Sequence, residues 1–168
     1  VLRSLHAICL LAADPRVKAA LDRGYQYYRD NLFLPDGMPV TRDARYPVDI
    51  HACAEAILCS SVLSDLYPDA RALSSLSLEW TAAHMRSAKT LLPFYRRYPF
   101  LTSRITYPRW SVAWMFYALC EYSAKVGVRN DAAASPHAQR SGVDAAASPR
   151  QSRPAPNPSG VLDAPRRV

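Results

Sequence analysis

The stretch DIHACAEAILCSSVLSDL, residues 49–66, is the strongest indication of the fold. From residue 50 to residue 66 apolar side chains occupy nearly every face of a helix, and a helix that is hydrophobic all round is buried. Residues 2–13 and 109–124 show the same pattern. The sequence therefore predicts three buried helices.

Two helices of another kind separate these three. Residues 15–33 and 69–86 carry an apolar stripe on one face only, which is typical of surface helices. The stripes consist of Val17, Leu21, Tyr25, Tyr28 and Leu32 in the first helix, and of Leu73, Leu76, Trp80 and Ala83 in the second. The alternation of buried and surface helices predicts a two-layer ring or superhelix of helix hairpins.

The connections favour the ring. The turns from buried to surface helix are short, whereas the returns over residues 34–48 and 87–108 are long. The second return contains PFYRRYPFLTSRITYPRW and reads as a strand pair. A stacked solenoid would keep both turns short, so we expect an all-α chain that forms part of an α/α toroid with long loops over one mouth.

Composition divides the chain of 168 residues into two parts. All seventeen aromatic residues precede Gly127, and the part after it repeats DAAASP and is rich in proline. Such a segment buries too little apolar surface to offset its ordering entropy. We expect a toroid domain over residues 1–126 and a disordered low-complexity tail over residues 127–168.

Charge and cysteine usage give weaker indications of function. The formal net charge of +7 divides into +4 before residue 127 and +3 after it, which suggests affinity for anions without choosing nucleic acid over an acidic sugar. Cys9, Cys53, Cys59 and Cys120 lie in apolar helical patterns without metal-ligand spacing. We expect reduced buried thiols in a cytoplasmic protein, with no metal, no cofactor and no membrane span. The apolar opening that contains Arg3 is shorter than we expect of a signal peptide, and it begins with Val1 rather than Met. We therefore expect a piece of a longer protein.

The long loops lead into the N-termini of buried helices, where a partial positive charge suits anionic or hydroxyl-rich ligands. RYPVDIHACAEA, residues 45–56, places Tyr46, Asp49, His51 and Glu55 at one such end. Asp49 is a favourable N-cap, and His51 and Glu55 share a helix face. Either the two carboxylates serve as general acid and base with His51 beside them, or Asp49 only caps the helix and Glu55 only pairs with His51.

The opposite side of the expected mouth offers groups that could bind a ligand. Trp110 could stack on a sugar ring or a base, and Arg109 could bind a carboxylate or phosphate through two bonds. If FYRRYPF is a strand, Arg96 and Arg97 point to opposite faces, so at most one of them lines the opening. The alternative is a solvated hairpin edge whose charges discourage edge pairing.

Four stretches together resemble a bacterial family encoded among exopolysaccharide biosynthesis genes, the VpsJ-type polysaccharide biosynthesis proteins. They are GYQYYRDNLFLPDGMP, RYPVDIHACAEAI, FYRRYPF and ITYPRWSVAWMFYAL, and the likeness spans residues 1–125. The resemblance implies the C-terminal half of a six-hairpin α/α toroid, the glycosidase-like architecture, but supplies no reaction. The chain departs from the family's pattern at Ser111-Val112 and at Glu55, where relatives tend to have Gly-Gln and Gln.

Taken together, these features predict a carbohydrate-active protein of exopolysaccharide biosynthesis or processing that acts on or binds an acidic polysaccharide. Asp49, His51 and Glu55 are the candidate catalytic residues, and Tyr46, Arg96, Arg97, Arg109 and Trp110 are the candidate substrate-binding residues. One alternative is a non-catalytic polysaccharide-binding or scaffold subunit that works with other exopolysaccharide biosynthesis proteins. A toroid that handles isoprenoids is another, and nucleic-acid binding has only nonspecific charge to support it.

Overall fold

A computed structural model describes residues 1–127 of the chain, so the expected tail over residues 128–168 lies outside the described residues. Five α-helices make up most of the described part. They are α1 (Leu2–Leu11), α2 (Pro15–Asn31), α3 (Ile50–Leu63), α4 (Pro68–His84) and α5 (Ala113–Tyr122). Two π-helical turns, η1 (Pro108–Val112) and η2 (Ser123–Gly127), flank α5. The mainly helical fold and all five expected helices are confirmed.

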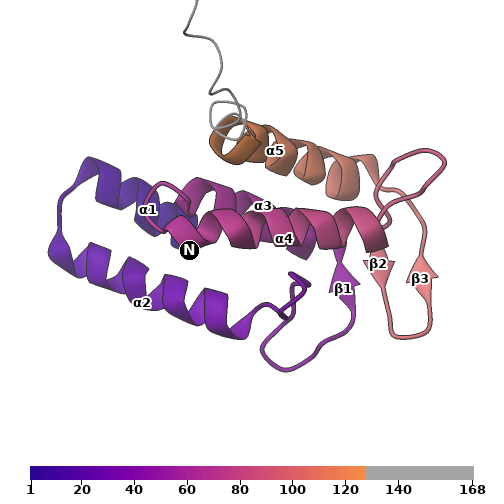
Figure 1. Ribbon diagram of the computed structural model, residues 1–168, viewed down its shortest axis with the longest axis horizontal. Helices are drawn as coiled ribbons and strands as arrows, with labels where there is room; N and C mark the ends of the chain where they lie inside the picture. Colours follow the sequence, from indigo (N-terminus) through magenta and orange to yellow (C-terminus); the bar gives the residue numbers. More distant parts are fainter. Residues whose placement is uncertain (128–168) are drawn as a thin grey trace, which may run out of the picture. The chain divides into compact units, whose positions relative to one another are not determined.

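The structure also contains a small sheet, of which two strands were predicted and one was not. Strands β1 (Val48–Asp49), β2 (Arg96–Arg97) and β3 (Thr102–Ser103) form an antiparallel sheet in the order β1-β2-β3. The expected pair within residues 87–108 is present, whereas β1 was not foreseen and the chain is therefore not purely α-helical. Pairing of Asp49 with Arg96 joins the start of α3 to the hairpin. Figure 1 shows the sheet at one end of the helices.

Helix α3 is the centre of the structure because it contacts α1, α4 and α5. It buries ten residues, including Ile50, Ile57, Leu58 and Leu63, as expected for a helix that is apolar all round. Arg3 near the start of α1 contacts Glu55 in the second turn of α3, and His51 at the start of α3 contacts Trp114 near the start of α5. The N-terminal ends of α3 and α5 therefore lie together at the sheet end, whereas α1 begins beside the middle of α3.

The expectation that α1 and α5 are also buried is wrong. Helix α1 buries only His6 and exposes Leu10 and Leu11, and α5 exposes Phe116 and Tyr117. The physical reason is that α3 has helices on both flanks, whereas α1 and α5 each contact α3 on one side. The apolar pattern of these two helices shows which of their residues another element could cover. Within the described part of the chain, no element covers them.

The contact of α3 with α4 also differs from the expected stripe. Helix α4 buries Ser74, Ser77 and Thr81 beside Trp80, while Leu76 stays 41% exposed. Ser61 and Ser74 share a hydrogen bond of 2.7 Å between their Oγ atoms. Small hydroxyl side chains let the two helices approach closely, so the buried face of α4 is more polar than its sequence pattern suggested.

The connection from α2 to α3 packs into the core through a tight turn. Met38 is buried, and the backbone N–H of Leu34 donates to the Met38 carbonyl at 3.0 Å. Gly37 makes this turn possible with φ of +84°, a conformation that side chains with a Cβ rarely adopt. A Cβ at Gly37 would lie 2.5 Å from the backbone carbonyl carbon of Leu76, so the turn also rests directly on α4.

Candidate functional site

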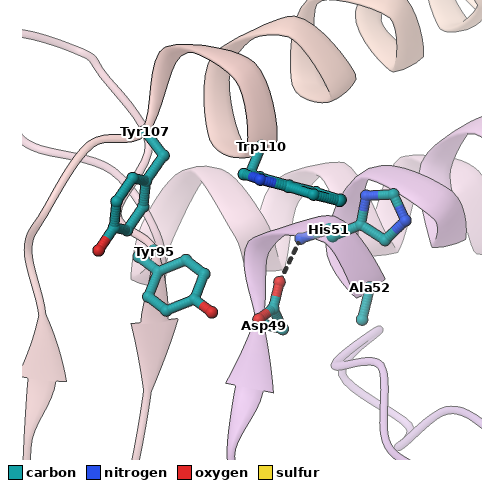
Figure 2. A pocket seen from close by; sticks show the side chains of 6 residues that line it. All are labelled: Asp49, His51, Ala52, Tyr95, Tyr107 and Trp110. Carbon is teal, nitrogen blue, oxygen red and sulfur yellow. Dashed lines mark hydrogen bonds between the residues drawn. The ribbon is translucent and has the colours of Figure 1, made fainter.

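The sheet end of the molecule contains a pocket of about 560 Å³. It is lined by Asp49, His51, Ala52, Tyr95, Tyr107 and Trp110. Figure 2 shows the rings of Tyr95 and Tyr107 on one side of this space, Trp110 above it, and Asp49 with His51 opposite the tyrosines. The lining therefore combines three aromatic side chains with a carboxylate and an imidazole.

Asp49 joins the helix to the sheet. Its Oδ1 accepts a hydrogen bond of 2.8 Å from the backbone N–H of His51, which caps α3 as the sequence predicted. Its Oδ2 accepts two hydrogen bonds from the Arg96 guanidinium, from Nη2 at 2.8 Å and from Nε at 3.1 Å. This contact raises the pKa of Arg96, so that side chain stays charged. Both carboxylate oxygens of Asp49 are thus engaged within the protein.

Trp110 reaches the pocket from the widened turn η1. Pro108 begins this turn, and the backbone N–H groups of Ser111 and Val112 both donate to the Tyr107 carbonyl, at 2.7 and 3.3 Å. The buried Ser111 also accepts a hydrogen bond of 3.4 Å from the Tyr107 N–H. Single π-helical turns of this kind are frequent at functional sites because they re-aim side chains. Here the turn leaves Trp110 58% exposed at the pocket.

His51 lies against two indole rings. Its ring centroid is 4.7 Å from Trp114 and 6.2 Å from Trp110, both in edge-to-face geometry. Its Nδ1 atom is buried and has no hydrogen-bond partner among the described residues. A buried ring nitrogen without a partner is uncommon, because it loses its bond to water without replacement. His51 is therefore held in place by aromatic contacts and keeps an unused polar atom.

Glu55 does not join this pocket. Its carboxylate accepts two hydrogen bonds from Arg3 Nη2, at 2.8 and 3.1 Å, so its partner is an arginine of α1 and not His51. The pair lies beside a second hollow of about 560 Å³ whose lining includes Tyr28 and Cys59. Asp49, which caps α3, and Glu55, which lies in its second turn, thus line different hollows.

The other predicted binding residues are also dispersed. Tyr46 packs against the main core cluster with the Arg45 guanidinium 6.0 Å from its ring centre. Arg97 lines a third hollow beside the β2–β3 turn, and Arg109 is exposed without belonging to the pocket lining. As expected for neighbours on a strand, Arg96 and Arg97 have different surroundings.

Besides Ala52, the lining residues that were not predicted are Tyr95 and Tyr107. Their rings meet edge to face with centroids 4.9 Å apart. Tyr95 immediately precedes β2 and Tyr107 immediately precedes η1, so they lie on either side of the hairpin. Their aromatic character was visible in the sequence, but only the pairing of β2 with β3 brings them together.

The buried thiols of Cys53 and Cys59 are not activated as nucleophiles. Burial raises the pKa of Cys53 to about 12 and that of Cys59 to about 11, so both stay protonated near neutral pH. All four cysteines are free, and Cys120 is exposed rather than buried because nothing covers that side of α5 among residues 1–127. In that same part of the chain, no group of three His, Cys, Asp or Glu side chains is placed to hold a metal ion.

Comparisons with known proteins place this site in no family: no family description, no curated protein and no solved structure matches the chain. Among the described residues, no helix has the length and apolar character needed to cross a membrane.

Proposed function

We propose that the pocket between α3, η1 and the sheet binds a sugar ring of a bacterial exopolysaccharide. The observation that carries this proposal is the lining itself, three aromatic rings around a carboxylate and an imidazole. Ligand sites commonly combine apolar walls with a few polar groups that fix orientation. A pyranose ring has the same two kinds of surface, since its C–H faces are apolar and its edge carries hydroxyl groups.

The aromatic side chains would meet the apolar face of the ring. Trp110 offers a large exposed surface, and Tyr95 and Tyr107 supply hydroxyl groups as well as rings. Asp49 can still accept a hydrogen bond from a sugar hydroxyl, because an ionised carboxylate has about four lone-pair sites and Asp49 uses three of them. The pocket therefore has both stacking surfaces and an acceptor at its floor.

The carboxylates favour binding over glycosidic cleavage by an acid and a base. Glycosidases hold two carboxyl groups on either side of one bond. Here Asp49 is paired with Arg96, and Glu55 is paired with Arg3 beside another hollow. The non-catalytic alternative is thus better supported than a reaction that uses both acids.

Preference for an acidic sugar depends on Arg109. Arg96 is neutralised by Asp49, and Arg97 lines the separate hollow at the β2–β3 turn. Arg109 is exposed and adjacent to Trp110 in η1, and it makes no ion pair within the described residues. It is the arginine best placed along the chain to meet an anionic substituent of a sugar bound against Trp110.

A partial α/α toroid is the architecture within which we place this pocket. The contacts of α1 with α3 and of α3 with α5 form an inner row, and α2 and α4 follow their inner partners along the chain as the second layer. The N-terminal ends of α3 and α5 meet at the end that holds the pocket, as expected of neighbouring inner helices at a toroid mouth. The VpsJ-type resemblance, and with it the role in exopolysaccharide biosynthesis, belongs to the same proposal.

His51 favours an enzyme as the second candidate. Its ring lines the pocket, and imidazole is the side chain that most often transfers protons in enzyme active sites. In this case His51 would act alone on a bound sugar, with Asp49 orienting the ligand rather than exchanging protons.

Titration calorimetry with a panel of neutral and acidic exopolysaccharide oligomers tests the proposal. We expect at least one oligomer to bind, and Trp110→Ala to weaken its affinity by about tenfold or more, as is usual for a central aromatic contact. Phe116→Ala is the matched control, since it also removes an exposed aromatic ring but lies on α5 outside the pocket lining. Equal affinity for wild type and Trp110→Ala, or no binding by any oligomer, contradicts the proposal.

Two further variants divide the hypotheses. Arg109→Gln should weaken binding of acidic oligomers and leave neutral ones unchanged. Product analysis with wild type and His51→Gln decides between binding and catalysis, because only an enzyme releases new chain ends that disappear in the variant. Glu55→Gln should change neither result, since Glu55 lies outside the pocket lining.

A further inference from the structure

The β2–β3 turn exposes two adjacent large apolar side chains at its tip. The backbone N–H of Tyr98 donates to the Leu101 carbonyl at 2.7 Å and closes the turn. Phe100 at its tip is 102% exposed and Leu101 is 68% exposed. A single exposed apolar residue needs no explanation, but two adjacent large ones on a projecting turn leave contiguous apolar surface in water.

The same turn is bordered by positive charge. Arg97 precedes it and Arg104 follows it, and both line a hollow of about 450 Å³ together with Tyr98, Pro99, Phe100, Leu101 and Thr102. Neither guanidinium has an acidic partner within residues 1–127, and Arg104 lies over the Phe94 ring at 5.6 Å. The two arginines are therefore available to an anion at the base of the apolar tip.

The surrounding sequence contains no acid that could oppose this charge. Between Glu79 and Glu121 there is no aspartate or glutamate, while six arginine or lysine residues occur. Of these six, Arg96 is the one that pairs with a carboxylate in the described structure, namely with Asp49. The apolar tip formed by Phe100 and Leu101, with Arg97 and Arg104 beside it, therefore complements a partner surface that is anionic outside and apolar inside.

We propose that the β2–β3 turn docks the protein on an anionic membrane surface. Phe100 and Leu101 enter the boundary between headgroups and acyl chains, Tyr98 lies at the headgroup level, and Arg97 and Arg104 bind lipid phosphate in the adjacent hollow. Apolar insertion combined with attraction to anionic lipid is the general mode of interfacial membrane binding. A bilayer fits better than a saccharide, because sugar rings stack on aromatic faces and do not cover a projecting leucine.

This inference is independent of the saccharide pocket. The turn and the pocket have no lining residue in common among those described, so each can be altered without the other. Docking through the turn would bring the described part of the chain to a membrane surface.

Vesicle co-sedimentation of the full chain tests the proposal. We expect binding to vesicles of phosphatidylcholine with one-third phosphatidylglycerol, and far weaker binding to phosphatidylcholine alone. Phe100→Ala combined with Leu101→Ala should lower the partition coefficient by about tenfold or more, since two large apolar side chains are lost from the interface. The matched control is Leu10→Ala combined with Leu11→Ala, two exposed leucines of α1, which should change it by less than about twofold.

The charge is tested separately with Arg97→Gln combined with Arg104→Gln. We expect a loss of about tenfold on the anionic vesicles. Arg23→Gln combined with Arg42→Gln removes the same charge from exposed positions elsewhere and should have a much smaller effect. The proposal is overturned if the wild type does not bind anionic vesicles, or if both turn variants bind like their controls. It is also overturned if an acidic oligosaccharide binds through Phe100 and Leu101 while vesicles do not bind.

Discussion

Replacement of Asp49 by asparagine should destabilise the fold by breaking one specific contact. The backbone cap of α3 survives, because asparagine is as good an N-cap as aspartate. The charge that faces Arg96 is lost, together with the strength of the two bonds at 2.8 and 3.1 Å. This variant therefore tests the structural role of the Asp49 carboxylate, which joins the start of α3 to the sheet, separately from any role in ligand binding.

The expected magnitude follows from the exposure of the pair. Hydrogen bonds to charged groups contribute about 1.5–3 kcal/mol when well shielded. The side chains of Asp49 and Arg96 keep 26% and 32% of their surface exposed, so solvent screening lowers this contribution. We expect Asp49→Asn to reduce the free energy of unfolding by about 1–2 kcal/mol. Asp49→Ala also removes the cap and should cost about 1 kcal/mol more.

Urea denaturation followed by circular dichroism measures these differences. A double-mutant cycle of Asp49→Asn with Arg96→Met isolates the pair, because methionine keeps much of the apolar stem of the arginine. We expect a coupling energy of about 1–2 kcal/mol. A coupling below about 0.3 kcal/mol, or an Asp49→Asn variant as stable as wild type, would refute the claim that this carboxylate is committed to Arg96.

Two further predictions concern the turn before α3 and the buried thiols. Gly37→Ala should lower the free energy of unfolding by at least about 2 kcal/mol, because φ is +84° and the new Cβ would meet the α4 backbone. Gly24→Ala is the milder control in the same urea assay, since its new Cβ would meet only a flexible side chain. The free energy of unfolding should also fall above pH 9. Burial raises the pKa of Cys53 to about 12 and that of Cys59 to about 11, from 9.0 for an unperturbed thiol. The unfolded chain therefore loses these protons at lower pH than the folded chain does, which favours unfolding. Urea titrations at pH 8 and pH 10 should differ by about 1–3 kcal/mol, and Cys53→Ala combined with Cys59→Ala should reduce that difference; a difference unchanged in the variant contradicts the assignment to these thiols.

The positions of the helices could be predicted from the sequence because helix formation is governed by local periodicity. The five expected helices match α1 to α5 within a few residues at each end, and Asp49 caps α3 as predicted. The strand pair was also visible in its aromatic and β-branched composition. Each of these features depends on residues that are close in the chain.

The order of loops and helices predicted that Asp49, His51, Glu55, Arg109 and Trp110 meet at one opening, and Asp49, His51 and Trp110 of these line the pocket. The lining was completed by Tyr95 and Tyr107, which the sequence could not single out among the aromatic residues of the 87–108 segment. Their position depends on the register of β2 with β3, and register is set by contacts on both strands at once.

The order, the type and the approximate limits of the helices could therefore be predicted from the sequence. Which partner each charged or apolar side chain obtains is visible only in the folded structure. Glu55 finds Arg3 at a separation of 52 residues and Asp49 finds Arg96 at a separation of 47, while Phe100 and Leu101 remain uncovered. Local periodicity fixes which face a helical residue occupies, but pairing over such separations follows from how the helices and the sheet pack, which no short stretch encodes.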